Sequence, residues 1–216
     1  MLLHRSTSWL TGLLALLILA ACASGPKPVA EGQRADAPTG PDGQPAMPID
    51  VPPRVLTLYE QAVSSMAAGD TIDAELRFQE FLLQYPGYPG AHVNLAIIFA
   101  ERGDDVAAEN SLTDALIIDP EHAAALNQLG MLLRRQGKFR EAEAAYTKAV
   151  AASPDYALAH YNLGVLNDLY LQRLDAALAH YERYQELAGE DAQVTKWIAD
   201  LKRRISATQR TANVTE

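Results

Sequence analysis

The pattern of apolar and polar positions divides the chain into three stretches. An apolar run from Trp9 to Leu19 follows the basic residue Arg5. Residues 23–53 show no apolar periodicity and contain eight of the twelve prolines. From residue 54 onward, segments that read as helices are interrupted at regular intervals by glycine and proline. The pattern therefore predicts an apolar leader, an extended linker and an all-α body.

The body is organised by a repeat of 34 residues. Three sets of identical residues have this spacing: Pro86, Pro120 and Pro154; Gly69, Gly103 and Gly137; and Ala74, Ala108 and Ala142. Glycine accepts the positive φ of a tight turn, and proline lacks the amide hydrogen that a helix interior requires. Each unit is therefore predicted to be a helix, a turn at the glycine, a second helix and a break at the proline.

The repeat resembles the tetratricopeptide repeat (TPR), a helical hairpin of about 34 residues. Four units can be counted, starting at Val55, Pro89, Ala123 and Ala157. Their eighth residue is small: Ala62, Ala96, Gly130 and Gly164. In the first three units the twenty-fourth residue is bulky: Phe78, Leu112 and Tyr146. A small residue facing a bulky one suits two helices that cross closely. The resemblance implies a right-handed superhelix of about four TPR hairpins within residues 54–190, at 55–88, 89–122, 123–156 and 157–190.

The fourth unit departs from this pattern. Its second helix fits only if one residue is inserted between Leu169 and Arg173, and Leu171 stands where the other units have glycine. Beyond it, apolar residues recur at helical spacing: Val194, Ile198, Leu201 and Ile205. This stripe predicts an amphipathic helix over residues 191–206 that caps the last repeat. Residues 207–216 are predicted to be a disordered tail.

The apolar run ends in Leu19-Ala20-Ala21-Cys22, which resembles the lipobox of bacterial lipoproteins. The resemblance implies a signal peptide over residues 1–21 and a lipidated Cys22 that carries fatty acid such as palmitate. The alternative for Cys22 is a buried free thiol. Because the chain has only this one cysteine, an internal disulfide is excluded. Residues 22–53 are then the lipidated cysteine and a disordered linker rich in proline, glycine and alanine. In bacterial lipoproteins an aspartate directly after the lipidated cysteine tends to retain the protein in the inner membrane. Ala23 stands at that position here, so the resemblance implies a location at the periplasmic face of the outer membrane.

Charge narrows the classes of partner. The net charge of −9 argues against nucleic acid, whose phosphates need a basic surface. Residues 55–122 contain twelve acidic and two basic residues, whereas residues 123–206 contain ten and eleven. The acidic half could steer a basic partner, although charge on outer helix faces also serves solubility alone.

In TPR proteins the first helix of each repeat lines an inner groove. The family positions that face the groove give these candidates: Tyr59, Val63, Asn94, Ile97, Asn127, Gln128, Met131, Arg134, Arg135, Tyr161, Asn162 and Val165. The recurring amides of Asn94, Gln128 and Asn162 can pair with the backbone of an extended peptide, or else with a neighbouring helix. Arg134 and Arg135 can pair with an acidic group of a ligand, or else with solvent or internal acids.

Some chaperone-binding TPR domains hold a C-terminal carboxylate with a lysine and an asparagine in the first helix. Tyr59 and Val63 stand at those positions here, which argues against this kind of receptor.

Motifs for catalysis are missing from the sequence. We find no metal-ligand helix motif, glycine-rich phosphate loop or cysteine pair, so neither an enzyme nor a cofactor is predicted. His92 and His160 lie two periods apart and are interpreted as packing residues, with a metal site or a pH switch as the alternative.

The sequence is therefore interpreted as a non-enzymatic scaffold for protein–protein interaction that binds envelope proteins. The resemblance is compatible with assembly of pilus secretins, TonB-type transport and adaptors of peptidoglycan enzymes. Two alternatives stay open: a structural lipoprotein that associates with itself as a homo-oligomer, and an enzyme with an unrecognised site.

Overall fold

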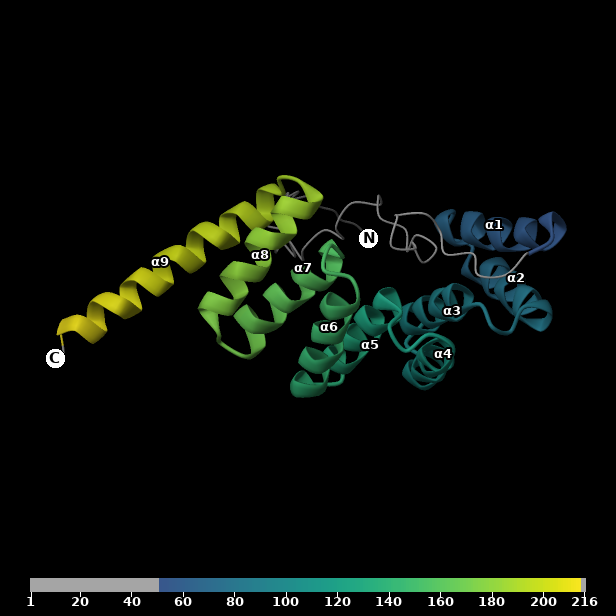
Figure 1. Ribbon diagram of the computed structural model, residues 1–216, viewed down its shortest axis with the longest axis horizontal. Coiled ribbons are helices and arrows are strands. Elements are labelled where there is room, and N and C mark those ends of the chain that lie inside the picture. Colours follow the sequence, from purple (N-terminus) through teal and green to yellow (C-terminus); the bar gives the residue numbers. More distant parts are fainter. Residues whose placement is uncertain (1–50, 215–216) are drawn as a thin grey trace, which may run out of the picture. The chain divides into compact units, whose positions relative to one another are not determined.

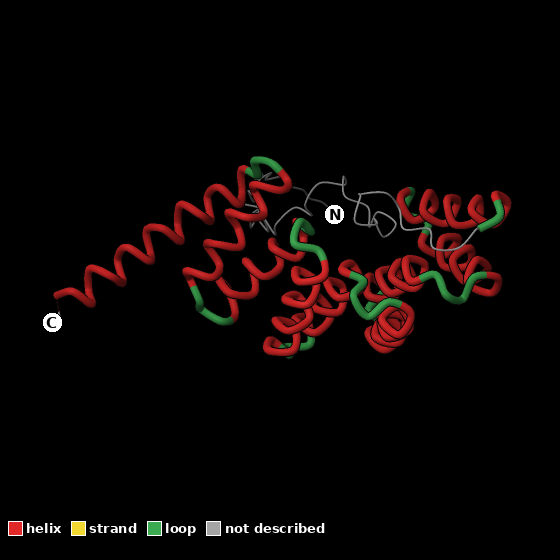
Figure 2. The backbone as a smooth tube through the Cα atoms, in the orientation of Figure 1, coloured by secondary structure: helices red, strands yellow, loops and turns green. Residues whose placement is uncertain are grey.

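The computed structural model describes residues 51–214 of the chain. The predicted signal peptide, Cys22 and all but the last three linker residues lie outside this range. Within it the chain folds into helices joined by short loops (Figures 1 and 2), and the all-α prediction is confirmed. The elements are α1 (Pro53–Ala67), α2 (Thr71–Gln84), α3 (Pro89–Glu101), α4 (Asp105–Ile118), α5 (Ala123–Arg135), α6 (Phe139–Ala152), α7 (Ala157–Val165), the π-helical turn η1 (Leu166–Tyr170), α8 (Leu174–Ala188) and α9 (Ala192–Val214).

The helices pack as four consecutive hairpins, here called the first to fourth repeats: α1–α2, α3–α4, α5–α6 and α7–η1–α8. Neighbouring repeats touch through α2 and α3, α4 and α5, and α6 and α7, and α9 packs on α8. The first three turns contain Gly69, Gly103 and Gly137 with φ of 80°, 82° and 75°. These are left-handed values that glycine adopts without steric cost, so the predicted turns at the glycines are confirmed.

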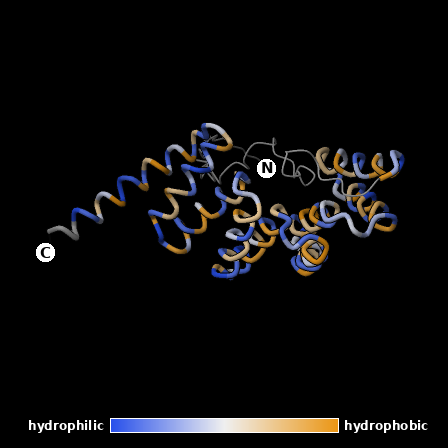
Figure 3. Tube along the Cα trace, viewed as in Figure 1, coloured by the Kyte–Doolittle hydropathy of each residue, from blue (hydrophilic) through white to orange (hydrophobic). Residues whose placement is uncertain are grey.

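Small residues let the two helices of a repeat cross closely, as the sequence indicates. A Cβ atom added to Gly130 would lie 2.5 Å from the ring of Tyr146, and one added to Gly164 would lie 2.5 Å from the ring of Tyr181. Both tyrosines are almost completely buried. Figure 3 shows apolar and polar positions alternating along the helices, as expected where each helix buries one face.

The fourth repeat contains the extra residue that its sequence predicts. The amide of Leu171 donates to the carbonyl of Leu166 at 3.0 Å, a five-residue spacing that adds one residue to the helix. The left-handed conformation therefore falls on Gln172, with φ of 56°, one position after the place where the repeat would have glycine. Its side-chain amide donates to the carbonyl of Asp168 at 3.3 Å.

Both ends of the body differ from the sequence prediction. Val51, expected in the linker, is buried in the first hydrophobic cluster beside Val55, so packed structure begins earlier. The capping helix was predicted to end at residue 206, but α9 continues to Val214. Ser206 and Thr208 donate to carbonyls four residues earlier, and residues 207–214 contain no glycine or proline to end the helix. The tail prediction is therefore wrong for residues 207–214.

The cap packs as predicted at three of its four stripe residues, whereas Ile205 is only half-buried and lies outside the cluster. Val194, Ile198 and Leu201 are buried against the fourth repeat, and Trp197 packs on Tyr181 with 5.4 Å between ring centroids. Across residues 51–214, no helix combines the length and the apolar character needed to cross a bilayer.

Candidate functional site

The recurring asparagines bridge neighbouring repeats. The side-chain amide of Asn94 donates to the Tyr59 hydroxyl at 3.1 Å, and that of Asn162 donates to Asn127 Oδ1 at 2.9 Å. Asn94 and Asn162 are only 4% and 5% exposed. Because these donors are used within the fold, the structure supports the interpretation in which they bond a neighbouring helix. For Asn94 and Asn162 it argues against the alternative, in which their amides pair with a peptide backbone.

Two further candidates belong to the core. Tyr59 and Val165 are each 7% exposed and lie in hydrophobic clusters of the first and fourth repeats. Val63, Ile97 and Tyr161 are half-buried and pack against the clusters of their own repeats. These five side chains fill the hairpins, and only the half-buried three also present part of their surface to solvent.

The remaining candidates meet at one pocket of about 350 Å³. Gln128, Met131, Arg134 and Arg135 reach it from α5, at the spacing of one helix face. Helices α3 and α4 supply small and apolar side chains, and η1 supplies an aromatic ring. The full lining is Ala96, Ala100, Ala108, Leu112, Gln128, Met131, Leu132, Arg134, Arg135 and Tyr170.

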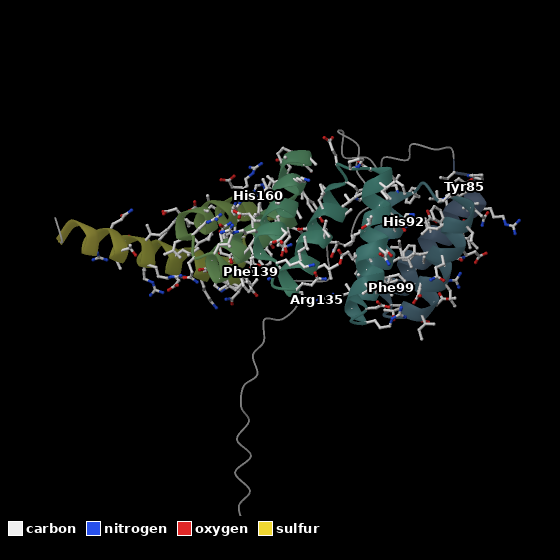
Figure 4. All side chains as sticks on the ribbon, turned by 90° about the horizontal axis from the view of Figure 1, so that it is seen from below. Tyr85, His92, Phe99, Arg135, Phe139 and His160 are labelled. Carbon is white, nitrogen blue, oxygen red and sulfur yellow. The ribbon has the colours of Figure 1, made fainter. Side chains whose placement is uncertain are left out.

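The two adjacent arginines differ in what they contact. Arg135, labelled in Figure 4, donates from Nη1 to the carbonyl of Ala100 at 2.9 Å and forms an ion pair with Asp105. It thereby joins the third repeat to the second. Arg134 forms no ion pair with any carboxylate of residues 51–214, and its Nε is buried without a hydrogen-bond partner there. The pocket therefore contains one positive charge that the described fold does not neutralise.

Three buried or half-buried tyrosines lie near enough to Arg134 for its charge to affect their pKa values. Burial raises the pKa of Tyr146 to about 12, and the nearby charge of Arg134 acts in the opposite direction. Burial likewise raises the pKa of Tyr161 and of Tyr181, with Arg134 again opposing the shift. These phenols are neutral at physiological pH, because their net shifts are upward from an ordinary value of 10.0. Because they are neutral, these phenols do not cancel the charge of the guanidinium.

Tyr170 is the pocket residue that the sequence reasoning missed. It ends η1, is 43% exposed, and its ring centroid lies 6.0 Å from the guanidinium carbon of Arg134. The ring also packs on Phe139, with centroids 4.6 Å apart. Asp168, buried in the same turn, accepts a hydrogen bond from Arg204 Nη1 at 2.8 Å, which fixes η1 to α9. The inserted residue was the available signal, since an irregular turn redirects the side chains that it contains.

The histidines bind to the backbone of the preceding repeat. Nε2 of His92 lies 3.0 Å from the carbonyl oxygen of Pro86, and Nε2 of His160 lies 3.0 Å from that of Pro154. Nδ1 of His160 therefore accepts, and Nδ1 of His180 donates to it at 3.2 Å. These bonds match the packing interpretation of His92 and His160 (Figure 4). Residues 51–214 contain no cluster of three or more His, Cys, Asp or Glu side chains suited to a metal ion.

Exposed apolar side chains also lie on the second helices of the first two repeats, and they are here called the outer apolar surface. On α2, Ile72, Leu76 and Leu83 are 71%, 61% and 85% exposed. On α4, Val106 and Ile117 are 72% and 73% exposed. The periodicity used to find the groove does not reveal this surface, because these residues lie outside the repeat consensus.

Comparison with known families identifies the repeats. Two family models, both described as tetratricopeptide repeat, match residues 89–155 and 127–193. Comparison of the sequence with curated proteins found no match.

Solved structures with the same fold include pilF of Pseudomonas aeruginosa. It has a TM-score of 0.64 and 24% identity over 73% of this chain and 72% of that one. A thermophilic TPR protein of Thermus thermophilus has a TM-score of 0.59 and 25% identity, over 68% of this chain and 80% of that one. MamA of Desulfovibrio magneticus RS-1 has a TM-score of 0.59 and 19% identity, over 75% and 91%. The family matches and the stacked hairpins together show that the body of this chain is an all-α superhelix of tetratricopeptide repeats.

Proposed function

We propose that this chain is a lipid-anchored scaffold that holds a segment of an envelope protein in its TPR groove, at the periplasmic face of the outer membrane. A TPR fold suggests a protein–protein interaction scaffold, and such folds are typically not catalytic. The observation that carries the proposal is the pocket on α5. There Gln128, Met131 and Arg134 are accessible, while the neighbouring asparagines are used within the fold.

The anchor and the address come from the sequence alone. The lipobox-like residues Leu19 to Cys22 support lipidation, and Ala23 after the cysteine supports the outer membrane. The partner would then belong to an envelope complex, in secretin assembly, TonB-type transport or peptidoglycan processing. The chain's linker, about 30 residues long, would let the repeats reach such a complex some tens of ångströms from the bilayer.

Site-specific photocrosslinking in cells tests the groove. A photoreactive residue replaces Met131, which is 38% exposed in the pocket, with Leu83 on α2 and Thr147 on α6 as outward-facing controls. We expect one discrete protein adduct at position 131 and none at the controls. An adduct confined to position 83 would move the binding surface to the outer helices, and no adduct at all would contradict a bound protein.

A Cys22→Ser variant tests the anchor. The native chain is expected to incorporate labelled palmitate and to fractionate with the outer membrane, whereas the variant does neither. If the variant still fractionates with the outer membrane, the lipid is not what holds the protein there.

The exposed apolar side chains of α2 and α4 favour self-association as the second candidate function. Light scattering of the purified chain measures its mass, and a Leu76→Lys, Leu83→Lys variant tests this surface. A dimer that the double substitution dissociates supports the structural role. A monomeric native chain excludes it at the concentration measured.

A further inference from the structure

We propose that the pocket on α5 is a subsite for an acidic side chain, in which Arg134 binds the carboxylate of an aspartate or glutamate within the bound segment. This proposal rests on the proposed function, because it names the chemistry of the segment that the groove would hold. It concerns a side chain inside a segment and not a chain terminus.

The first support is the isolation of Arg134 among the half-buried arginines of the described repeats and cap. Arg77, Arg183 and Arg204, which are also half-buried, each lie within 4.0 Å of a carboxylate. Arg134 has no such partner in residues 51–214, although its Nε is shielded from solvent. A partly desolvated charge is unfavourable until a counter-charge approaches, so an incoming carboxylate gains more here than at an exposed arginine.

The second support is that no acidic residue of the described repeats and cap is free to take the place of a ligand anion in the pocket. Asp105 is paired with Arg135, and Asp168 is paired with Arg204. The surrounding tyrosines are neutral for the reasons given above. The guanidinium can share a donor with the neutral hydroxyl of Tyr146, but no carboxylate of residues 51–214 pairs with it. A ligand carboxylate is therefore a stronger acceptor than anything the described fold offers, and two parallel N–H donors match its two oxygens.

The rest of the lining selects what accompanies the acidic group. The small side chains of Ala96 and Ala100 leave space at the base of the pocket. Met131 and Tyr170 offer partly exposed apolar surface beside the guanidinium. A volume of about 350 Å³ has room for an acidic side chain and one apolar neighbour. Because alternate residues of an extended segment point the same way, the two side chains that enter should be two positions apart.

Peptide selection tests this chemistry without knowledge of the natural partner. The full chain, kept in mild detergent because of its apolar N-terminal run, is immobilised and presented with displayed random dodecapeptides. The Arg134→Gln variant is tested in parallel. The matched control is Arg140→Gln, which removes one exposed positive charge from the first turn of α6, outside the pocket lining. Circular dichroism confirms that all three proteins are folded.

The native chain and the Arg140→Gln control should enrich peptides with Asp or Glu two positions from an apolar residue. The Arg134→Gln variant should lose this preference for acids. A selected peptide should bind that variant about ten-fold or more weakly by calorimetry. Changing its acid to the matching amide should weaken binding to the native chain equally and have no further effect on the variant.

Two outcomes would overturn the inference, and they are distinguishable. Peptides that bind without acidic preference, and equally to the native chain and to Arg134→Gln, would leave a peptide-binding groove but remove the acidic subsite. Failure of the native chain to select any peptide would contradict both the subsite and the proposed groove function.

Discussion

The third and fourth repeats solve the same packing problem with different turns. In both, a glycine in the first helix faces an aromatic ring of the second, Gly130 against Tyr146 and Gly164 against Tyr181, at the same close approach. The third repeat turns at Gly137 and contains no extra residue. The fourth absorbs one residue in η1 and places Gln172 in the left-handed region. The comparison indicates that the helix crossing is the fixed feature of a repeat and that the turn adapts to it.

The adapted turn also changes what the groove contains. In the third repeat the turn follows directly after Arg135, whereas in the fourth the added residue leaves Tyr170 beside Arg134 of the preceding repeat. An irregularity in one repeat thus completes a pocket on its neighbour. Four predictions test how far the two repeats are alike.

The largest loss of stability is expected when a methyl group is added where the two helices of a repeat cross. Gly130→Ala and Gly164→Ala each place a methyl group 2.5 Å from a buried tyrosine ring, which cannot move without disturbing the core. Each should lower the free energy of unfolding by about 2 kcal/mol, the usual cost of overpacking. Urea denaturation measures this change. The control is Gly87→Ala, where an added Cβ meets nothing within 4 Å.

A second substitution sharpens this test. Adding Tyr146→Leu to Gly130→Ala recreates the Ala96 and Leu112 combination of the second repeat and should recover part of the loss. If Gly164→Ala proves harmless while Gly130→Ala does not, the crossings are unequal and the comparison fails.

The next effect concerns the amide bridge between these two repeats. Asn162→Ala removes the donor to Asn127 Oδ1 and leaves a buried acceptor unpaired, which should cost about 1–2 kcal/mol of unfolding free energy. Asn127→Ala should cost a similar amount, and the double variant should cost less than the sum of the two. Additive losses would show that the amides do not interact. If Asn162→Ala left the stability unchanged but abolished peptide binding, Asn162 would contact the ligand and not the neighbouring helix.

Much of this fold follows from the sequence, because the features that define it are local. The 34-residue spacing of glycine and proline gives the hairpins, and the misfit near Leu171 gives the inserted residue. The pocket follows less well, because adjacent or recurring residues receive different partners in space. Arg134 and Arg135 have the same side chain, and contacts distant in the sequence distinguish them: Arg135 binds the Ala100 carbonyl and Asp105, which lie 35 and 30 residues earlier.

The same holds for the asparagines. Whether the amide of Asn94 faces a ligand or a neighbouring helix depends on where the Tyr59 hydroxyl lies, 35 residues away. Tyr170 could not be placed because its direction is set by the π-helical turn and not by the repeat register. Sequence periodicity thus identifies the surface that could bind, and tertiary contacts decide which of its residues are free.

A third prediction uses pH to probe the histidine contact of the fourth repeat. Burial, followed by the neighbouring His160, lowers the pKa of His180 below its ordinary value of 6.5. The folded state then binds fewer protons than the unfolded state, so the contribution of His180 is fully present above pH 6.5 and is lost as the pH falls below it. The slope from this one group is at most about 1.4 kcal/mol per pH unit.

Denaturation between pH 8 and pH 5 measures this loss. Burial also lowers the pKa of His122, so His122 contributes to the same loss of stability at low pH, in the native chain and in the variant alike. A His180→Gln variant should show a shallower decline than the native chain, with the remainder assigned to His122. An unchanged slope would mean that His180 protonates as easily in the folded chain as in the unfolded one.

The smallest effect is expected at the turns themselves. Gln172→Gly relieves the left-handed conformation that a side chain disfavours, at φ of 56°. It also removes the amide that caps the carbonyl of Asp168. The relief of about 1 kcal/mol should exceed the loss of two long hydrogen bonds from this amide, to the carbonyls of Asp168 at 3.3 Å and Leu169 at 3.5 Å, for a net gain of about 0.5 kcal/mol. Gly137→Gln, the reciprocal change in the third repeat, should destabilise because that position has φ of 75° and no inserted turn to accommodate it. Thermal denaturation measures both changes in stability. A gain for Gln172→Gly and a loss for Gly137→Gln would show that the two turns differ only in where the left-handed residue falls. A loss of stability in both variants would show that Gln172 holds η1 in place.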